Sequence, residues 1–131
     1  MKSNIIKIAI IIAVLLTCLC YVKAQTSCVT YKNISYGWNS VTEHWDEVGT
    51  TYDHIKISLY KNDIYVESKN MSHYTTYQLF DSSDEDGVSS KTWKAYDEHN
   101  KSLKVIVKYY KGIISYSFMY SDCMYSYYSL L

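Results

Sequence analysis

Two short segments place a histidine beside carboxylates, which is the combination that acid–base chemistry needs. His44 lies close to Asp46 and Glu47, and His99 follows the acidic pair at positions 97–98. A carboxylate can orient an imidazole that then moves a proton. No nucleophile accompanies them, because the chain has no Gly-x-Ser-x-Gly motif and its mature cysteines are expected to pair. A minor hydrolase therefore ranks last among the functions considered, and we predict no enzyme and no cofactor.

The acidic segment 81–87 is the nearest approach to a metal site. When the segment is aligned on Gly87, Asp84 and Asp86 take the third and fifth positions of a calcium loop. The twelfth position is Trp93, where such a loop needs a bidentate Glu. We therefore expect a solvated turn, with weak calcium binding through Asp84 and Asp86 as the alternative.

Tyrosine is abundant, with 16 residues in a chain of 131. The adjacent pairs at 109–110 and 127–128 must point to opposite faces of a strand, so some rings face solvent or a cavity. An exposed tyrosine offers a large rigid contact area and a hydroxyl group. The alternative is that tyrosine serves β propensity and cross-strand packing. The predicted binding residues are aromatic: Trp45, Tyr110, Tyr125 and Tyr127.

The N-terminus has the features of a removable export signal. Two lysines precede an apolar run over 8–19, and residues 22–24 offer a cleavage site before Gln25. We predict a secretory signal peptide over residues 1–24 and a single β domain over residues 25–131. The mature protein is then exported to the periplasm or the extracellular space.

Charge and composition limit the partners of the mature chain. Removal of residues 1–24 takes three of the 13 lysines and no acidic residue, which leaves a net charge of −3. The chain contains no arginine, so it has no guanidinium group to grip phosphates. Because nucleic-acid binding depends on clustered cations, we expect no nucleic-acid partner. We also expect no transmembrane segment once the leader is removed.

Two cysteines, Cys28 and Cys123, remain after cleavage. An oxidising compartment favours a disulfide between them, and closing so long a loop would stabilise the fold by up to about 4.7 kcal/mol. A third cysteine raises a different possibility. The segment that ends at Cys18 resembles the lipobox of bacterial lipoproteins, with Thr17 where Gly or Ala is usual. A lipid anchor at Cys18 is therefore the alternative to simple cleavage.

Hydrophobic residues in the mature chain recur with a period of two, which indicates half-buried strands. Seven or eight short strands joined by tight turns predict an all-β antiparallel meander that forms a small barrel or a sandwich. The first strand is expected over 27–36 and the last over 123–130, as neighbours sealed by the disulfide. The segment 37–51 is the least periodic and predicts a long loop or a short helical turn. The predicted core residues are Ile57, Leu59, Val105, Val107, Tyr116 and Phe118.

This layout loosely resembles small exported bacterial β proteins of unknown activity. The resemblance depends on the strand spacing and the aromatic C-terminal strand, and it implies no function.

The preferred function is a non-enzymatic binding or interaction module that meets a partner protein or a glycan through a tyrosine-rich surface. The second is a lipocalin-like carrier of a small apolar ligand, which requires an open interior. A packed core with an aromatic surface patch favours the interaction module, whereas a cavity inside the barrel favours the carrier.

Overall fold

The computed structural model describes residues 26–131, so the predicted signal peptide and Cys18 lie outside the described residues. Ten strands form one antiparallel sheet in the order β1-β4-β5-β6-β7-β8-β9-β10-β2-β3. The strands are β1 (Thr26–Val29), β2 (Lys32–Asn39), β3 (His44–Thr51), β4 (Lys56–Tyr60), β5 (Asp63–Glu67), β6 (Met71–Glu85), β7 (Val88–Asp97), β8 (Ser102–Tyr110), β9 (Ile113–Met119) and β10 (Cys123–Leu130). The predicted all-β meander is confirmed, with ten strands in place of seven or eight. Over residues 26–131, the structure has no helix that could cross a membrane.

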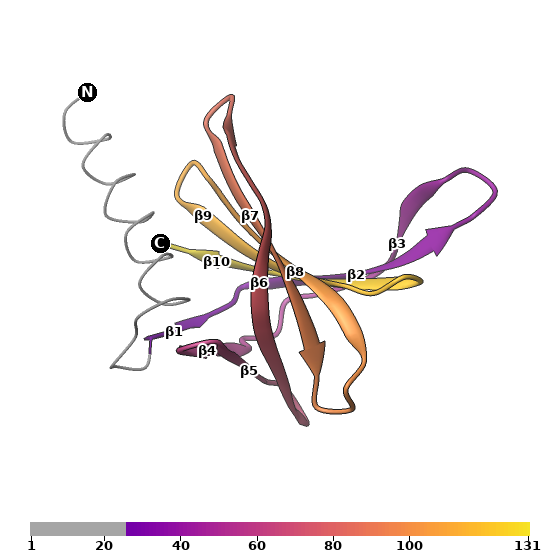
Figure 1. The fold of residues 1–131 in the computed structure, drawn as a ribbon. Coiled ribbons are helices and arrows are strands. Elements are labelled where there is room, and N and C mark those ends of the chain that lie inside the picture. Colours follow the sequence, from indigo (N-terminus) through magenta and orange to yellow (C-terminus); the bar gives the residue numbers. More distant parts are fainter. Residues whose placement is uncertain (1–25) are drawn as a thin grey trace.

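The sheet curls into a half-barrel, and β1 and β2, which follow one another in the chain, pair with opposite ends of the run of strands from β4 to β10 (Figure 1). β1 pairs with β4, whereas β2 pairs with β10, and only Thr30 and Tyr31 separate β1 from β2. The Tyr31 N–H donates a hydrogen bond to the Tyr128 carbonyl at 2.9 Å. One nearly continuous stretch of chain therefore pairs with both ends of the meander, which protects strand edges that would otherwise be open.

A buried polar cluster holds this junction together. Thr30 is 0% exposed, and its hydroxyl donates to Asn33 Oδ1 at 2.9 Å. The same hydroxyl oxygen accepts the Ile55 N–H at 3.1 Å. Asn33 Nδ2 in turn donates to the Asp53 carbonyl at 3.0 Å. These hydrogen bonds satisfy polar groups that burial would otherwise penalise, and they tie β2 to the segment that leads into β4.

Packed side chains fill the inner face of the half-barrel. All six predicted core residues are buried, and Phe118 is 0% exposed. The Phe118 ring stacks on Tyr74 with centroids 4.2 Å apart and meets Tyr127 edge-on at 5.7 Å. The remaining buried members of this core are Ile64, Val66, Trp93, Ala95, Leu103 and Ile114. The predicted core is therefore confirmed.

Two hairpins turn on residues with positive φ. Asp86 and Gly87 have φ values of 54° and 76°, and Lys111 and Gly112 have values of 49° and 80°. Two consecutive positive φ values are typical of the type I′ turn, whose twist matches that of the flanking strands. A glycine at the second position accepts this conformation without strain.

Two segments expected to be loops are strands. Residues 37–51 form most of the β2–β3 hairpin, in which Trp38 pairs with Trp45. A β-bulge between Ser35 and Tyr36 shifts the register there, and this explains the lost alternation. β6 also runs on through Glu85, so the acidic segment is mostly strand because β7 pairs with it. Pairing with a neighbouring strand has overridden low intrinsic β propensity in both cases.

The predicted disulfide is absent, since Cys28 and Cys123 are both free. Cys28 lies on β1 and its side chain is hydrogen-bonded to Ser129, near the C-terminal end of β10. Cys123 begins β10, six residues away, which at about 3.3 Å per residue is roughly 20 Å. A disulfide requires Cα atoms within about 7 Å. The predicted first strand over 27–36 is divided into β1 and β2, and only β2 pairs with the last strand, β10. Cys28 lies on β1, opposite Ile57 of β4, so the expectation that the first and last strands are neighbours is wrong for the part of the chain that carries this thiol.

Candidate functional site

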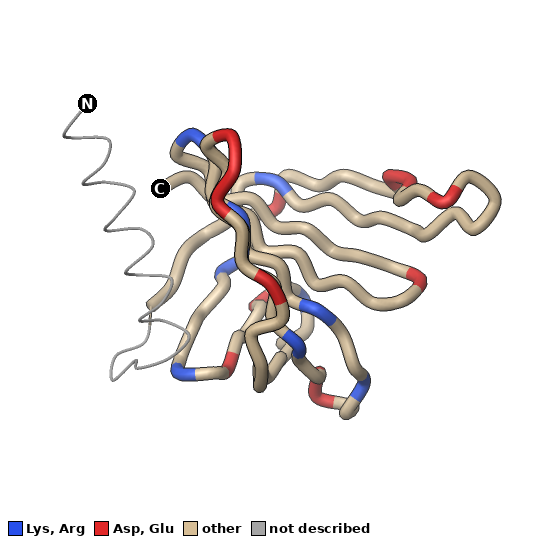
Figure 2. The backbone as a smooth tube through the Cα atoms, turned by 45° about the horizontal axis from the view of Figure 1, so that its top comes forward, with Lys and Arg blue, Asp and Glu red and all other residues tan. Residues whose placement is uncertain are grey.

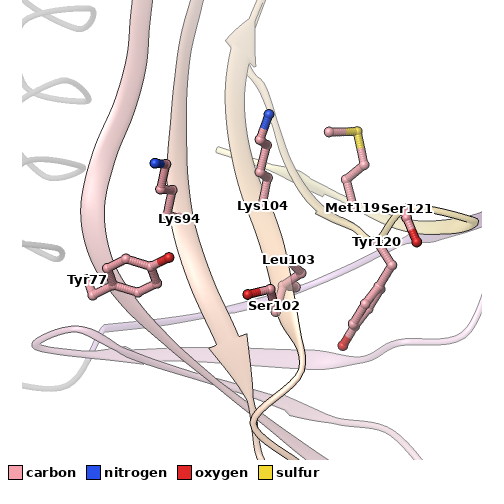
Figure 3. Close-up of a pocket in the computed structure, with 8 residues that line it drawn as sticks. All are labelled: Tyr77, Lys94, Ser102, Leu103, Lys104, Met119, Tyr120 and Ser121. Atoms are coloured by element: carbon pink, nitrogen blue, oxygen red, sulfur yellow. The ribbon is translucent and has the colours of Figure 1, made fainter.

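An open groove of about 410 Å³ lies across strands β6 to β9 (Figure 3). Its lining combines two ammonium groups, four hydroxyl groups and two apolar side chains: Tyr77, Lys94, Ser102, Leu103, Lys104, Met119, Tyr120 and Ser121. Six of these eight side chains can donate a hydrogen bond. The groove is therefore suited to a ligand that is both polar and partly apolar.

Two β-bulges in β6 present aromatic rings on this face. The register passes from Thr76 opposite Ala95 to Gln78 opposite Lys94, which leaves Tyr77 without a partner on β7. A second shift leaves Phe80 unpaired in the same way. Bulges re-aim side chains and are common next to functional sites. Both extra residues are aromatic, and their side chains are 58% and 52% exposed.

The two rings lie in a wider aromatic cluster that includes the lysine pair. Tyr77 stacks on Tyr96 of β7 with centroids 5.9 Å apart and planes inclined by 29°. The Lys104 ammonium lies 4.2 Å from the Phe80 ring centroid, and the Lys94 ammonium lies 5.5 Å from the same centroid. Cation–π contacts of this kind hold an ammonium group against an aromatic face. Phe80 therefore positions both cations beside the groove.

Lys94 and Lys104 occupy directly opposite positions on β7 and β8. Like charges placed in this way destabilise a sheet unless something compensates them. Over residues 26–131 the ion pairs involve histidine, as in His73 with Asp63, so no carboxylate neutralises either lysine. The groove therefore carries two uncompensated positive charges.

The end of the groove near Tyr120 is held by hydrogen bonds. The Tyr120 hydroxyl donates to Asp97 Oδ2 at 2.8 Å, and the Lys101 N–H donates to Asp97 Oδ1 at 2.9 Å. Burial, followed by the hydrogen bond to Asp97, raises the pKa of the Tyr120 phenol. Tyr120 is therefore neutral and oriented at physiological pH, with its proton donated to Asp97. Asp97 also closes the turn between β7 and β8, which fixes this wall of the groove.

The four predicted binding residues do not form one surface. Tyr110 is exposed near the β8–β9 turn, and Trp45 lies on the β2–β3 hairpin against Trp38, with ring centroids 5.2 Å apart. Tyr125 is exposed on β10, where a hydrogen bond with the Cys123 side chain raises its pKa.

The prediction that Tyr127 faces solvent is wrong. Tyr127 pairs with Tyr116 on the core face, and its side chain packs against the core. Burial raises the pKa of its phenol accordingly. The exposed tyrosines are instead Tyr52, Tyr60, Tyr77, Tyr96, Tyr110 and Tyr125.

The segments suggested for calcium and for acid–base chemistry remain separate. Asp84 ends up near the tip of the β6–β7 hairpin, where it accepts a hydrogen bond from Ser89 at 3.3 Å, and Asp86 lies in the turn. Within residues 26–131, no group of three or more His, Cys, Asp or Glu side chains is placed to hold a metal ion. His44 lies on the β2–β3 hairpin and His99 in the β7–β8 turn, so these two segments do not converge (Figure 1).

One histidine–carboxylate pair escaped the sequence analysis. His73 Nε2 lies 2.9 Å from Asp63 Oδ1, and the Thr75 hydroxyl donates to the same oxygen at 3.1 Å. The His73 ring also stacks on Tyr65, with centroids 4.6 Å apart. The register of β5 and β6 creates this contact, and it could have been derived by pairing the two predicted strands.

The sequence pattern did not predict the groove, and only part of its lining could have been predicted in that way. The alternation of residues 91–97 and 103–110 about a short turn indicates that Lys94 and Lys104 lie on neighbouring strands, but the register that places them directly opposite comes from the structure. The bulges that expose Tyr77 and Phe80 have no comparable local signal, since an extra residue merely interrupts the alternation.

No family model, no curated protein and no solved structure matches this chain.

Proposed function

We propose that the protein is an exported, non-enzymatic binding module that holds a glycan in the groove across β6 to β9. The observation that carries this proposal is the pair of bulges that expose Tyr77 and Phe80 beside a cavity of about 410 Å³. Aromatic rings suit the apolar face of a sugar ring, and the hydroxyl groups of the lining suit its polar edge. The volume lies in the lower part of the range for small-ligand sites.

The carrier function has less support. Ile57, Val105 and Phe118 are fully buried on the inner face, where a carrier would hold its ligand. An apolar ligand would have to displace well-packed side chains, which costs several kcal/mol for each large side chain. The groove is open to solvent and requires no such displacement.

The test compares two exposed tyrosines on an oligosaccharide array. Tyr77→Ala removes an aromatic wall of the groove, whereas Tyr110→Ala removes a similarly exposed ring six residues along β8 from Lys104, about 20 Å away. Both changes are at the surface, so both should leave the free energy of unfolding within about 0.5 kcal/mol of the original protein.

We expect the original protein and Tyr110→Ala to retain the same oligosaccharides and Tyr77→Ala to lose them. Retained oligosaccharides should keep their mass after prolonged incubation, as a binding module without turnover requires. An array on which the protein retains nothing, or equal losses for the two variants, would contradict the proposal. Cleaved oligosaccharides would show that the protein is an enzyme.

A partner protein is the second candidate, and the β2–β3 hairpin is the observation that favours it. β3 is the last strand of the sheet, so its outer backbone groups are free to pair with another strand. Figure 2 shows acidic residues along this projecting hairpin, and residues 33–55 contain no lysine or arginine. The hairpin also exposes Val41 and Val48. A basic, extended segment would suit this edge.

Amide hydrogen exchange tests this candidate directly. A synthetic octapeptide that alternates lysine and valine should protect the β3 amides that point away from β2. An octapeptide of alternating glutamate and valine is the matched control, and it should protect none. Protection by both peptides, or by neither, would remove the hairpin as a specific docking edge.

A further inference from the structure

We propose that the ligand of the groove is a sugar that bears a carboxylate, held between Lys94 and Lys104. This inference rests on the proposed function and adds the chemical class of the ligand. Both ammonium groups lie against the Phe80 ring, at 4.2 and 5.5 Å from its centroid, and the two lysines are directly opposite on neighbouring strands, so both flexible side chains can reach one anion. A carboxylate has two oxygens, and one can accept a charge-assisted hydrogen bond from each lysine.

The positions of the two lysines in the sheet favour binding of an anion. Lys94 and Lys104 are directly opposite on neighbouring strands, and no carboxylate of the described chain pairs with either. In the free protein no ion pair offsets their mutual repulsion, and the Phe80 ring is the attractive partner that the two ammonium groups share. A bound anion removes that repulsion and gains two ionic contacts, so the pair favours an anionic ligand over a neutral one.

The rest of the lining indicates a sugar in preference to other anions. Tyr77, Ser102, Tyr120 and Ser121 contribute four hydroxyl groups to the lining that they share with the lysines. A polyhydroxylated ring can exchange hydrogen bonds with all of them. The exposed Tyr77 ring then offers a flat surface to the C–H face of that ring.

The charge balance argues against a polyphosphate or a nucleic acid. The 13 acidic residues of the whole chain match its 13 lysines, and only two lysines line the groove. Nucleic-acid binding depends on many clustered cations, because each phosphate contact contributes through counterion release. Two lysines in a groove of this size suit a ligand with a single anionic group.

Isothermal titration calorimetry provides the test, with trigalacturonic acid and trimannuronic acid as acidic probes and cellotriose as the neutral one. The variant Lys94→Gln/Lys104→Gln removes both charges from the groove. The control Lys108→Gln/Lys111→Gln removes two charges from the far end of β8 and its turn, where neither side chain lines the groove. Urea unfolding of each variant shows whether the fold is retained, and single Lys104→Gln replaces the double variant if it is not.

We expect at least one acidic trisaccharide to bind, and removal of the two groove lysines to weaken it about tenfold or more. The control variant should change the affinity less than twofold, and added salt should weaken binding to the original protein. Equal affinities for acidic and neutral sugars, or no binding of either acidic sugar, would overturn the inference. Cellotriose binding that depends on Tyr77 alone would leave the proposed function intact while refuting the carboxylate. Displacement by poly-L-glutamate as effective as by the sugar itself would identify an acidic peptide site instead.

Discussion

Replacing Thr30 with valine tests whether hydrogen bonds close the half-barrel, since no disulfide does. Valine has nearly the shape of threonine, so Thr30→Val removes the hydroxyl and leaves no cavity. The lost hydroxyl donates to Asn33 Oδ1 at 2.9 Å and accepts the Ile55 N–H at 3.1 Å. Both partners stay in place and lose a hydrogen bond at a position that is 0% exposed.

The expected cost follows from these two orphaned groups. A buried donor or acceptor left without a partner costs about 1–3 kcal/mol. Two such groups, one of them the N–H of the half-buried Ile55, predict a loss of about 2–4 kcal/mol in the free energy of unfolding. At about 4 °C per kcal/mol for a domain of this size, the melting temperature should fall by about 8–16 °C.

Urea unfolding followed by tryptophan fluorescence measures the loss. With an m value of about 2 kcal/mol/M, the midpoint should fall by about 1–2 M. Thr30→Ser is the matched control, because it keeps the hydroxyl and removes only a methyl group. That control should lose about 1 kcal/mol.

The two variants together show whether the hydroxyl or the methyl group of Thr30 stabilises the junction. A midpoint for Thr30→Val that equals or exceeds the original, combined with a lower midpoint for Thr30→Ser, would show that methyl packing holds the junction. The role assigned to the hydroxyl would then be refuted.

Three further predictions concern the core, the thiols and alkaline stability. Phe118→Ala should cost about 3–5 kcal/mol in urea unfolding, because a fully buried ring that contacts two others is lost, and an unchanged midpoint would contradict this. Alkylation of the unreduced, unfolded protein should add two adducts, on Cys28 and Cys123, and a mass two hydrogens lower without adducts would restore the disulfide. In the folded protein Cys28 should react slowly, because burial raises the pKa of its thiol. Burial also raises the pKa of Tyr74 and Tyr120, so above about pH 10 the unfolded chain loses protons that the folded chain keeps. The free energy of unfolding should therefore fall from pH 10 upward, and Tyr120→Phe should make that fall less steep.

The local features of the fold could be predicted from the sequence because a strand side chain repeats every two residues. Ile114, Tyr116 and Phe118 alternate with serines, and all three are buried. The last strand is observed over Cys123–Leu130, as expected. Short turns also predicted which strands from β4 to β10 are neighbours, since these antiparallel partners follow one another in the chain.

Features that depend on contacts far apart in the sequence were missed or misjudged. Nothing near Tyr127 shows which side of β10 faces the core, because a tyrosine serves either face of a strand equally well. Its register opposite Tyr116 decided that it points inward. The bulges at Tyr77 and Phe80 follow from the pairing of β6 with β7, and pairing is a property of two strands together.

The sequence by itself determined that the described chain is all-β, that the strands from β4 to β10 follow one another as antiparallel neighbours, and which apolar residues form the core. Each of these follows from a local period of two and from short turns. The tertiary structure alone decided that β1 pairs with β4 whereas β2 pairs with β10. This pairing separates Cys28 from Cys123 and buries Thr30 at the junction of β1 and β2. It also decided that two aromatic bulges meet two lysines on the outer face. The physical reason is that closing and bulging a sheet depend on contacts between strands distant in the chain, which no local pattern records.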